Sequence, residues 1–340
     1  MRAVQIIDGS NTFTVQSQKR PKLRTGGAIV RMEAALVAPY MAALPSGAWM
    51  TPPRPFIPGQ CAIGVVEESS GDLQLGQRVY FDAYTGSNDP AHPCADHGFL
   101  GCFAVAPGAM RALANWPNGS FSELIHAPER CFSPIPDGIR TAPELLCRMG
   151  WLGTALAGLE RGGFQPGMTL AINGATGLLG ASAVALALAL DAGSVQIVGR
   201  RRAILDSLVK LDPARVCICD LRSTEPIDML LDCAGGDDTA TTEALIARLR
   251  RFGTAAFVGA LTTPLHLDSS ALMRNGNTIA GSFWFTADAR QRLLALVADG
   301  KLDLSCFAAK RFDISEIIAA ISHAQAKAGG LTHTVLVPEI

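Results

Sequence analysis

A glycine-rich turn stands where the sequence changes from strand-like to helix-like. Residues 172–181 read Ile-Asn-Gly-Ala-Thr-Gly-Leu-Leu-Gly-Ala and follow the apolar segment 168–173. Glycine allows a tight turn, Gly177 lets the backbone approach a pyrophosphate, and Gly180 lets the helix pack closely on the strand. The helix N-terminus adds N–H groups and partial positive charge, so a dinucleotide site is expected, with a turn that binds nothing as the alternative. Its residues are Asn173, Gly174, Ala175, Thr176, Gly177, Leu178 and Leu179.

The end of the next expected strand indicates which dinucleotide binds. Segment 195–198 runs into Gly199-Arg200-Arg201-Arg202, and no acid is present there. A site for NAD usually places Asp or Glu at this point, on the ribose 2′-hydroxyl. An arginine fork can instead hold a 2′-phosphate through two hydrogen bonds. We therefore predict NADPH, held here by Gly199, Arg200 and Arg201. The alternative is an exposed basic helix start, which the helix dipole disfavours.

Strands alternate with helices from about residue 146 onward. The expected helices cover 181–192 and 202–211. Such alternation predicts a parallel, doubly wound sheet. Cys217 and Cys219 alternate within one apolar run, so we expect them to be buried strand residues. The six expected strands are 168–173, 195–198, 214–219, 227–233, 253–258 and 277–282.

Both ends of the chain differ from this middle part in composition and in the pattern of expected elements. The N-terminal third is rich in proline and glycine, and it has short strand-like runs at 1–8, 27–37, 61–68, 76–81 and 119–125. Residues 82–119 form an irregular stretch that is long for a loop, so we expect it to shape the substrate pocket. The expected elements after residue 286 are helices at 290–299 and 314–328 and a strand at 332–337.

Composition narrows the function classes. A chain of 340 residues suggests about two domains. It has 29 basic and 30 acidic residues, and this net charge of −1 argues against a nucleic-acid or anionic-membrane partner. The longest apolar run, 178–190, is too short to span a bilayer. The nine cysteines include no C-x-x-C pair and the first residues lack the pattern of a secretory signal, so we expect a cytoplasmic protein.

Several further motifs occur in a characteristic order. They are 55–59 followed by 62–66, then 75–80, 119–123 and 135–138, the glycine turn, 231–236 and 257–260. With them the sequence resembles the medium-chain dehydrogenase/reductase superfamily, nearest its zinc-free quinone oxidoreductase and enoyl reductase branch. The resemblance implies an α/β fold in which a GroES-like, β-rich catalytic domain (1–145 and 287–340) surrounds a Rossmann, doubly wound nucleotide domain (146–286), with NAD(P) in the cleft. It also implies cofactor contacts at Thr154, Ala234, Gly235, Gly259, Ala260, Ser282 and Phe283.

The sequence departs from the zinc-dependent members of this superfamily. They carry a cysteine after the second long strand and Gly-His-Glu after the Pro-Gly motif. Here residues 36–41 contain no cysteine, and Gly59 is followed by Gln60 and Cys61. We therefore predict no catalytic metal, because the usual three ligands are missing. His92, Cys94, His97 and Cys102 lie close in sequence but lack the paired short spacing of a structural zinc lobe, so a metal-free loop is expected and a metal site is the alternative.

The usual proton donor of the enoyl reductase relatives is also missing. They place a tyrosine shortly after a Ser-Gly pair, and alignment on Ser46-Gly47 puts Trp49 there. An indole N–H donates a hydrogen bond but gives up no proton. Tyr40 and Tyr84 remain as candidate donors, with water as the alternative. Met41 replaces a residue that is polar in many relatives, which predicts a more apolar pocket.

These features predict an NADPH-dependent enzyme that transfers hydride to a conjugated enone, enoyl or quinone acceptor without zinc. The alternatives are a carbonyl or alcohol dehydrogenase of the same superfamily, and a catalytically silent NADPH-binding protein. The expected partner is a small electrophilic substrate, with neither nucleic acid nor membrane. Segment 277–285 would be the last strand of the nucleotide sheet, and an open apolar edge of this kind predicts pairing as a homodimer.

Overall fold

The computed structural model describes residues 1–86 and 96–338, and these divide into two compact units. Unit 1 spans Met1–Gly150, Phe307–Ala328 and Thr332–Ile340, and unit 2 spans Trp151–Cys306 and Gly329–Leu331. Both ends of the chain therefore contribute to unit 1. Among the described residues, no helix has the length and apolar character needed to cross a membrane.

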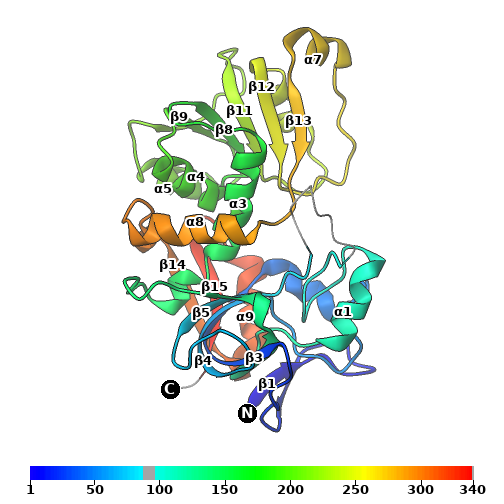
Figure 1. Ribbon diagram of the computed structural model, residues 1–340. Coiled ribbons are helices and arrows are strands. Elements are labelled where there is room, and N and C mark those ends of the chain that lie inside the picture. The colour runs from blue at the N-terminus through cyan, green and yellow to red at the C-terminus, as the bar shows by residue number, and fades with distance from the viewer. Residues whose placement is uncertain (87–95, 339–340) are drawn as a thin grey trace. The chain divides into compact units, whose positions relative to one another are not determined.

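Unit 1 is built on a mainly antiparallel sheet (Figure 1). Its strand order is β14-β15-β3-β4-β5-β7, and β6 also pairs with β3. A separate antiparallel pair joins β1 (Arg2–Gln5) and β2 (Thr14–Ser17). The strands of the larger sheet are β3 (Gly27–Val37), β4 (Cys61–Ser69), β5 (Arg78–Asp82), β6 (Leu124–Pro128), β7 (Phe132–Pro134), β14 (Ala308–Asp313) and β15 (Thr332–Val337).

The two chain ends meet on β3. This strand is the longest of the sheet, and nearly all of its side chains are buried because it lies between other strands. On one side β15 pairs with it antiparallel, with Thr334 opposite Val37, and on the other side β4 does so. The described helical segments of unit 1 are η1 (Pro39–Ser46), η2 (Pro107–Ala109), α1 (Met110–Asn115), η3 (Glu129–Cys131), α2 (Pro143–Leu146), η5 (Ile314–Glu316) and α9 (Ile317–Ala326), along with the first two residues of α3.

Unit 2 holds a six-stranded parallel sheet in the order β10-β9-β8-β11-β12-β13. The order reverses direction between β8 and β11, and ligands of open α/β sheets bind at the carboxyl end of such a switch point. The strands are β8 (Thr169–Asn173), β9 (Ser194–Ile197), β10 (Val216–Ile218), β11 (Ile227–Asp232), β12 (Leu249–Phe257) and β13 (Thr278–Gly281). All six strands predicted from the sequence are therefore confirmed, within a few residues at their ends.

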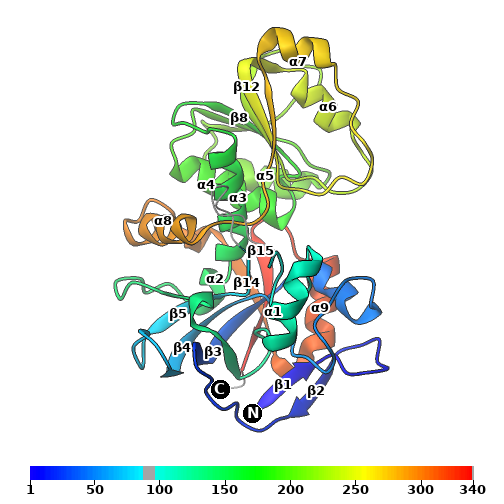
Figure 2. The ribbon, with the colours of Figure 1, turned by 45° about the vertical axis from the view of Figure 1, so that its right-hand side comes forward.

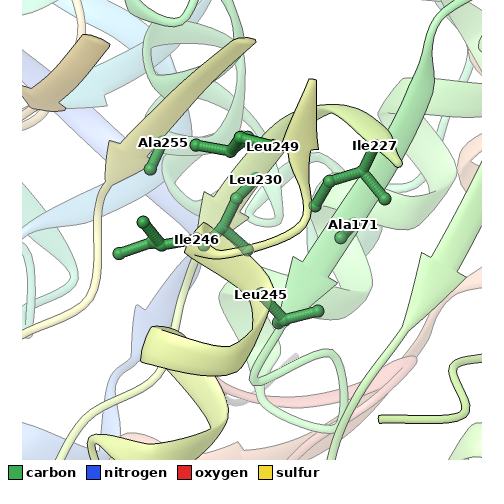
Figure 3. Close-up of a cluster of buried hydrophobic side chains, with 7 residues drawn as sticks. All are labelled: Ala171, Ile227, Leu230, Leu245, Ile246, Leu249 and Ala255. Carbon is green, nitrogen blue, oxygen red and sulfur yellow. The ribbon is translucent and has the colours of Figure 1, made fainter. Parts of the chain in front are cut away.

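Helices cover both faces of this parallel sheet. Crossovers between parallel strands are right-handed, so α4 and α5 lie on one face and α6 and α7 on the other (Figures 1 and 2). Leu245 and Ile246 of α6 pack against Ala171 of β8 and Leu230 of β11 (Figure 3). The helical segments are α3 (Met149–Arg161), α4 (Leu178–Ala189), α5 (Arg202–Val209), α6 (Ala240–Ile246), α7 (Ser269–Asn275), α8 (Ala287–Ala298) and η4 (Leu304–Cys306).

Two expectations about unit 2 need correction. Cys217 is exposed and Cys219 is only half-buried, although both were expected in the core. The reason is that β10 is the edge strand of the sheet, so an apolar run there is covered less than the same run at the centre. Residues 287–306 were expected in the catalytic domain, but they belong to unit 2, where Arg292 of α8 pairs with Glu160 of α3 at 2.6 Å.

Candidate functional site

The glycine turn of unit 2 leaves room beside its backbone. Gly174 has a φ of +73°, a conformation that other residues rarely adopt. A Cβ added to Gly180 would clash with the oxygen of Gly174 and lie 2.6 Å from the Cα of Ala175, so Gly180 allows α4 to pack on the turn. A Cβ added to Gly177 would meet only the Gly174 oxygen, at 3.3 Å. The turn therefore has the open approach that a pyrophosphate requires at a helix N-terminus.

A buried polar network holds the turn in place. The amide nitrogen of Asn173 donates to Asp232 at 3.2 Å and to Thr242 at 3.1 Å, while its oxygen accepts from the N–H of Gly174 at 2.9 Å. Asp232 also accepts from the Thr242 hydroxyl at 2.6 Å and from the N–H of Ala234 at 2.9 Å. Because a buried carboxylate is costly unless hydrogen bonds satisfy it, this network ties the end of β11 to the end of β8.

Asp232 and Thr242 were not among the predicted site residues. One signal was present in the sequence, since Asp232 ends an otherwise apolar strand segment, and a carboxylate there needs partners. Nothing in the sequence indicated Thr242, which comes from α6.

The loops that follow β8, β11 and β12 approach one another closely. A Cβ on Gly174 would lie 2.9 Å from the nitrogen of Ala234, and one on Gly259 would clash with the oxygen of Ala234. A Cβ on Gly235 would lie 3.4 Å from the oxygen of Ala260. The structure thus brings together these predicted cofactor residues at the carboxyl edge of the sheet.

The predicted 2′-phosphate residues have three different environments. A Cβ on Gly199 would lie 2.5 Å from Cγ2 of Thr176, so this glycine serves close packing on the turn rather than room for a ligand. The guanidinium of Arg201 donates to the backbone oxygen of Thr176 and lies against Gly329. Arg200 and Arg201 are both exposed, but the guanidinium of Arg201 already donates to the Thr176 oxygen, so Arg200 is the better placed of the two for a phosphate.

The remaining predicted cofactor residues of unit 2 lie near the end of β13 and on α3. Ser282 donates its backbone N–H to the oxygen of Phe257 at 2.9 Å, and the neighbouring Phe283 is 45% exposed. Thr154 is buried in α3. The preceding Gly153 packs on Phe285, because a Cβ there would lie 2.5 Å from that ring. Thr154 is therefore close in structure to the segment that carries Ser282 and Phe283.

Three of the four predicted catalytic residues join one aromatic cluster in unit 1. Phe103 packs edge-on against Tyr40 and Trp49, with ring centroids 6.2 Å and 4.7 Å away. Phe103 also contacts Phe99 at 5.4 Å, and Phe99 contacts Tyr84 at 5.2 Å. The aromatic cluster, as we name these five residues, is thus continuous from Tyr40 to Tyr84. It was not predicted, since Phe99 and Phe103 come from the irregular stretch.

Each phenol of the aromatic cluster has a polar partner. The Tyr40 hydroxyl donates to Oε1 of Gln60, and the Tyr84 oxygen lies 2.7 Å from Nδ1 of His97. Burial raises the pKa of Tyr40 well above its usual value, so this phenol stays protonated. Burial lowers the pKa of His97, so its imidazole is neutral near neutral pH. Met41, the fourth predicted catalytic residue, is a fully buried residue of η1 and presents no surface.

The residues at the expected zinc position differ from the ligand set of the zinc-dependent relatives. Gln60 offers a neutral amide whose oxygen already accepts from Tyr40. Burial raises the pKa of the neighbouring Cys61 thiol well above its usual value and that of Cys102 to about 12, so both thiols are protonated in the metal-free protein. In residues 1–86 and 96–338, no three His, Cys, Asp or Glu side chains are placed to hold a metal ion. His92 and Cys94 fall outside the described residues.

Comparisons with known proteins match unit 1 to a known domain family. The family model for the alcohol dehydrogenase GroES-like domain matches residues 24–137, all within unit 1. The alcohol dehydrogenase of Geobacillus stearothermophilus is 25% identical over 334 residues, which cover 93% of this chain and 94% of that protein.

Solved structures share the whole fold at low sequence identity. A dehydrogenase from Sinorhizobium meliloti 1021 bound to NADP has a TM-score of 0.83 at 20% identity, with 99% of both chains covered. The alcohol dehydrogenase RspB of E. coli CFT073, complexed with NADH, has a TM-score of 0.82 at 15% identity, also with 99% of both chains covered.

The predicted fold class is thereby confirmed, with a GroES-like unit and a Rossmann-like parallel sheet. The two neighbours hold NADP and NADH, respectively. The chain is therefore similar to alcohol dehydrogenases, in its GroES-like unit and over nearly its whole length to the Geobacillus protein.

Proposed function

We propose that this protein is an NADPH-dependent oxidoreductase that reduces a conjugated enone, enoyl or quinone acceptor without a catalytic metal. It would belong to the zinc-free quinone oxidoreductase and enoyl reductase branch. The observation that carries the proposal is the hydrogen bond from Tyr40 to Gln60. At the position where zinc-dependent relatives have a histidine ligand, this chain has an amide that is already bonded to a phenol. A conjugated acceptor is electrophilic enough to react without the Lewis acid that an isolated carbonyl needs.

The nucleotide would be held by residues of unit 2. The N–H groups at the start of α4 and the open side of Gly177 suit a pyrophosphate. Exposed Arg200 supports NADPH over NADH, because its guanidinium can bind a 2′-phosphate that NADH lacks. When bound, NADPH supplies the hydride, and the protein supplies orientation.

The acceptor would be bound by unit 1. The aromatic cluster supports this assignment, because apolar rings around a site exclude water and suit a planar conjugated molecule. Tyr84 supports protonation of the reduced product, because its phenol can give up a proton and His97, at 2.7 Å, can pass another to it. Tyr40 and water remain the alternative donors, and the hydroxyl proton of Tyr40 is engaged by Gln60.

A carbonyl or alcohol dehydrogenase is the second candidate. The match over nearly the whole chain to the Geobacillus alcohol dehydrogenase favours it. In that case a phenol of the aromatic cluster would have to polarise the carbonyl oxygen alone, because the residues described above do not fit zinc.

An NADPH oxidation assay across enones, quinones and aldehydes distinguishes these functions. The protein is treated with a chelator, and elemental analysis verifies that no metal remains. It is then assayed with and without added zinc. We expect turnover of enones or quinones that does not depend on zinc. Turnover of aldehydes or alcohols that requires stoichiometric zinc would overturn the proposal. Tight NADPH binding without turnover of any acceptor would instead indicate a silent binding protein.

A further inference from the structure

A cavity of about 380 Å³, open to solvent on one side, lies in unit 2, away from the glycine turn. Helices α3 and α8, side by side in Figure 1, form its walls. The apolar lining comes from both helices, from the turn after α3 and from the end of α4. It consists of Leu156, Leu159, Phe164, Pro166, Leu190 and Leu296. This volume and lining fall in the range of sites that bind small organic molecules.

The polar part of the lining carries an excess of negative charge. Among the lining residues, Glu160 and Asp299 are acidic and Arg292 is basic, with Arg292 paired to Glu160 at 2.6 Å. This leaves Asp299, an exposed residue, as the uncompensated charge of the lining.

Helix ends add to this charge. Leu190 is the C-cap of α4, Asp299 is the C-cap of α8, and Glu160 is the last residue but one of α3. Three helix C-termini therefore flank one cavity. The C-terminus of a helix carries partial negative charge and stabilises nearby cations.

We propose that this cavity is a binding site for a small amphipathic cation, a protonated amine on an apolar body. The apolar part would contact the leucines and Phe164, and the ammonium group would lie toward Asp299 and the helix C-termini. An anion would meet the same carboxylate and carbonyl groups unfavourably. This inference is independent of the proposed reductase function.

The cavity is separate from the nucleotide site. Gly177 caps the N-terminus of α4 and Leu190 caps its C-terminus. The helix has 12 residues, so the two ends are about 18 Å apart. A ligand in the cavity and a nucleotide at the glycine turn can therefore be bound at the same time.

Calorimetric titration of the full-length protein tests the site with three matched probes: octylammonium, octanoate and octanol. They share one chain and differ in charge. We expect octylammonium to bind with one-to-one stoichiometry, at least about tenfold more tightly than octanoate, since each helix end or carboxylate adds a small favourable interaction. Saturating NADPH should leave this binding unchanged. Equal affinity for octanoate, or displacement by NADPH, would overturn the proposal.

Two variants locate the bound probe. Ala295→Trp fills the cavity from the exposed side of α8 and should abolish binding, while Ala298→Trp, on the same helix but outside the lining, should not. Asp299→Asn should weaken octylammonium binding about two- to fivefold, the usual worth of an exposed ion pair. Asp288→Asn, at the other end of α8, is its matched control. If Ala295→Trp and Asp299→Asn both bind like the native protein, the cation does not occupy this cavity.

Discussion

The phenol oxygen of Tyr84 lies 2.7 Å from Nδ1 of His97, although 12 residues separate them in the sequence. Tyr84 also forms an isolated β-bridge with Phe99, which keeps the two segments together. A phenol that donates a proton needs a route for its replacement, and a neutral imidazole can provide one. This pair distinguishes Tyr84 from Tyr40, whose partner is a carboxamide with no exchangeable acid proton at that oxygen.

We therefore expect Tyr84→Phe to slow turnover of an enone by 10²- to 10⁴-fold, the usual contribution of a general acid. Tyr40→Phe should have a smaller effect, because it removes the hydrogen bond to Gln60 but leaves the Tyr84–His97 pair. The measurement is steady-state turnover with NADPH and with NADPH deuterated at the transferred position, and an isotope effect should be present in the native enzyme. Full activity of both variants would show that neither phenol is the donor.

Two glycines of the same turn should respond differently to substitution. Gly177→Val should abolish NADPH binding while the protein stays folded, because the added group meets only one backbone oxygen and extends into the space for the pyrophosphate. Gly180→Val should lower the melting temperature, because its Cβ clashes with the turn itself. Fluorescence titration and thermal unfolding measure the two effects. Normal NADPH affinity in Gly177→Val would remove this turn from the cofactor site.

Preference for NADPH should depend on Arg200. Replacement by alanine removes a charge-assisted contact of roughly 1.5–3 kcal/mol, so NADPH affinity should fall about 10- to 150-fold. NADH affinity should not change. Arg202→Ala is the matched control, since that side chain is also exposed but pairs with Asp206 at 2.9 Å. The prediction fails if the native protein binds NADH as tightly as NADPH.

The homodimer stays a prediction, now with a defined surface. β13 is the edge strand of the parallel sheet, and its Ile279 is 39% exposed. We expect light scattering to give a dimer mass at micromolar concentration, and Ile279→Lys to give a monomer. Ile318→Lys, at an exposed position of α9, is the control and should leave the mass unchanged. A monomeric native protein would contradict the prediction.

Stability should fall in acid because of His333. Burial, aided by Arg148, lowers the pKa of this histidine to about 3, and its Nε2–H donates to the oxygen of Glu144 at 2.8 Å. The unfolded chain takes up a proton below about pH 6.5, whereas the folded protein does so only near pH 3. Stability from this residue is therefore complete above pH 6.5 and is lost as the pH falls toward 3, by up to about 4 kcal/mol.

His333→Gln keeps a donor for the Glu144 oxygen but does not titrate. In urea unfolding between pH 7 and pH 4, the free energy of unfolding of this variant should fall less steeply than that of the native protein. Equal slopes for His333→Gln and the native protein would show that this histidine does not carry the acid sensitivity.

The sequence by itself determined the order of the elements and the nature of the nucleotide turn. The strands β8 to β13 and the turn at Gly174 were predicted because apolar runs, periodicity and glycines act over a few neighbouring residues. The sequence also showed that no His-Glu pair follows Gly59, because that observation requires only the residue types.

The tertiary structure decided which elements are neighbours, and therefore which side chains are exposed and which contact one another. Cys217 is exposed because strand order puts β10 at an edge, and no local pattern encodes strand order. Asn173 meets Asp232, 59 residues away, because β8 and β11 are neighbours in the sheet. Arg200 and Arg201 likewise differ in their surroundings, because the guanidinium of Arg201 reaches the Thr176 oxygen. Such pairings come from long-range packing, whose partners are chosen only when the whole chain is folded.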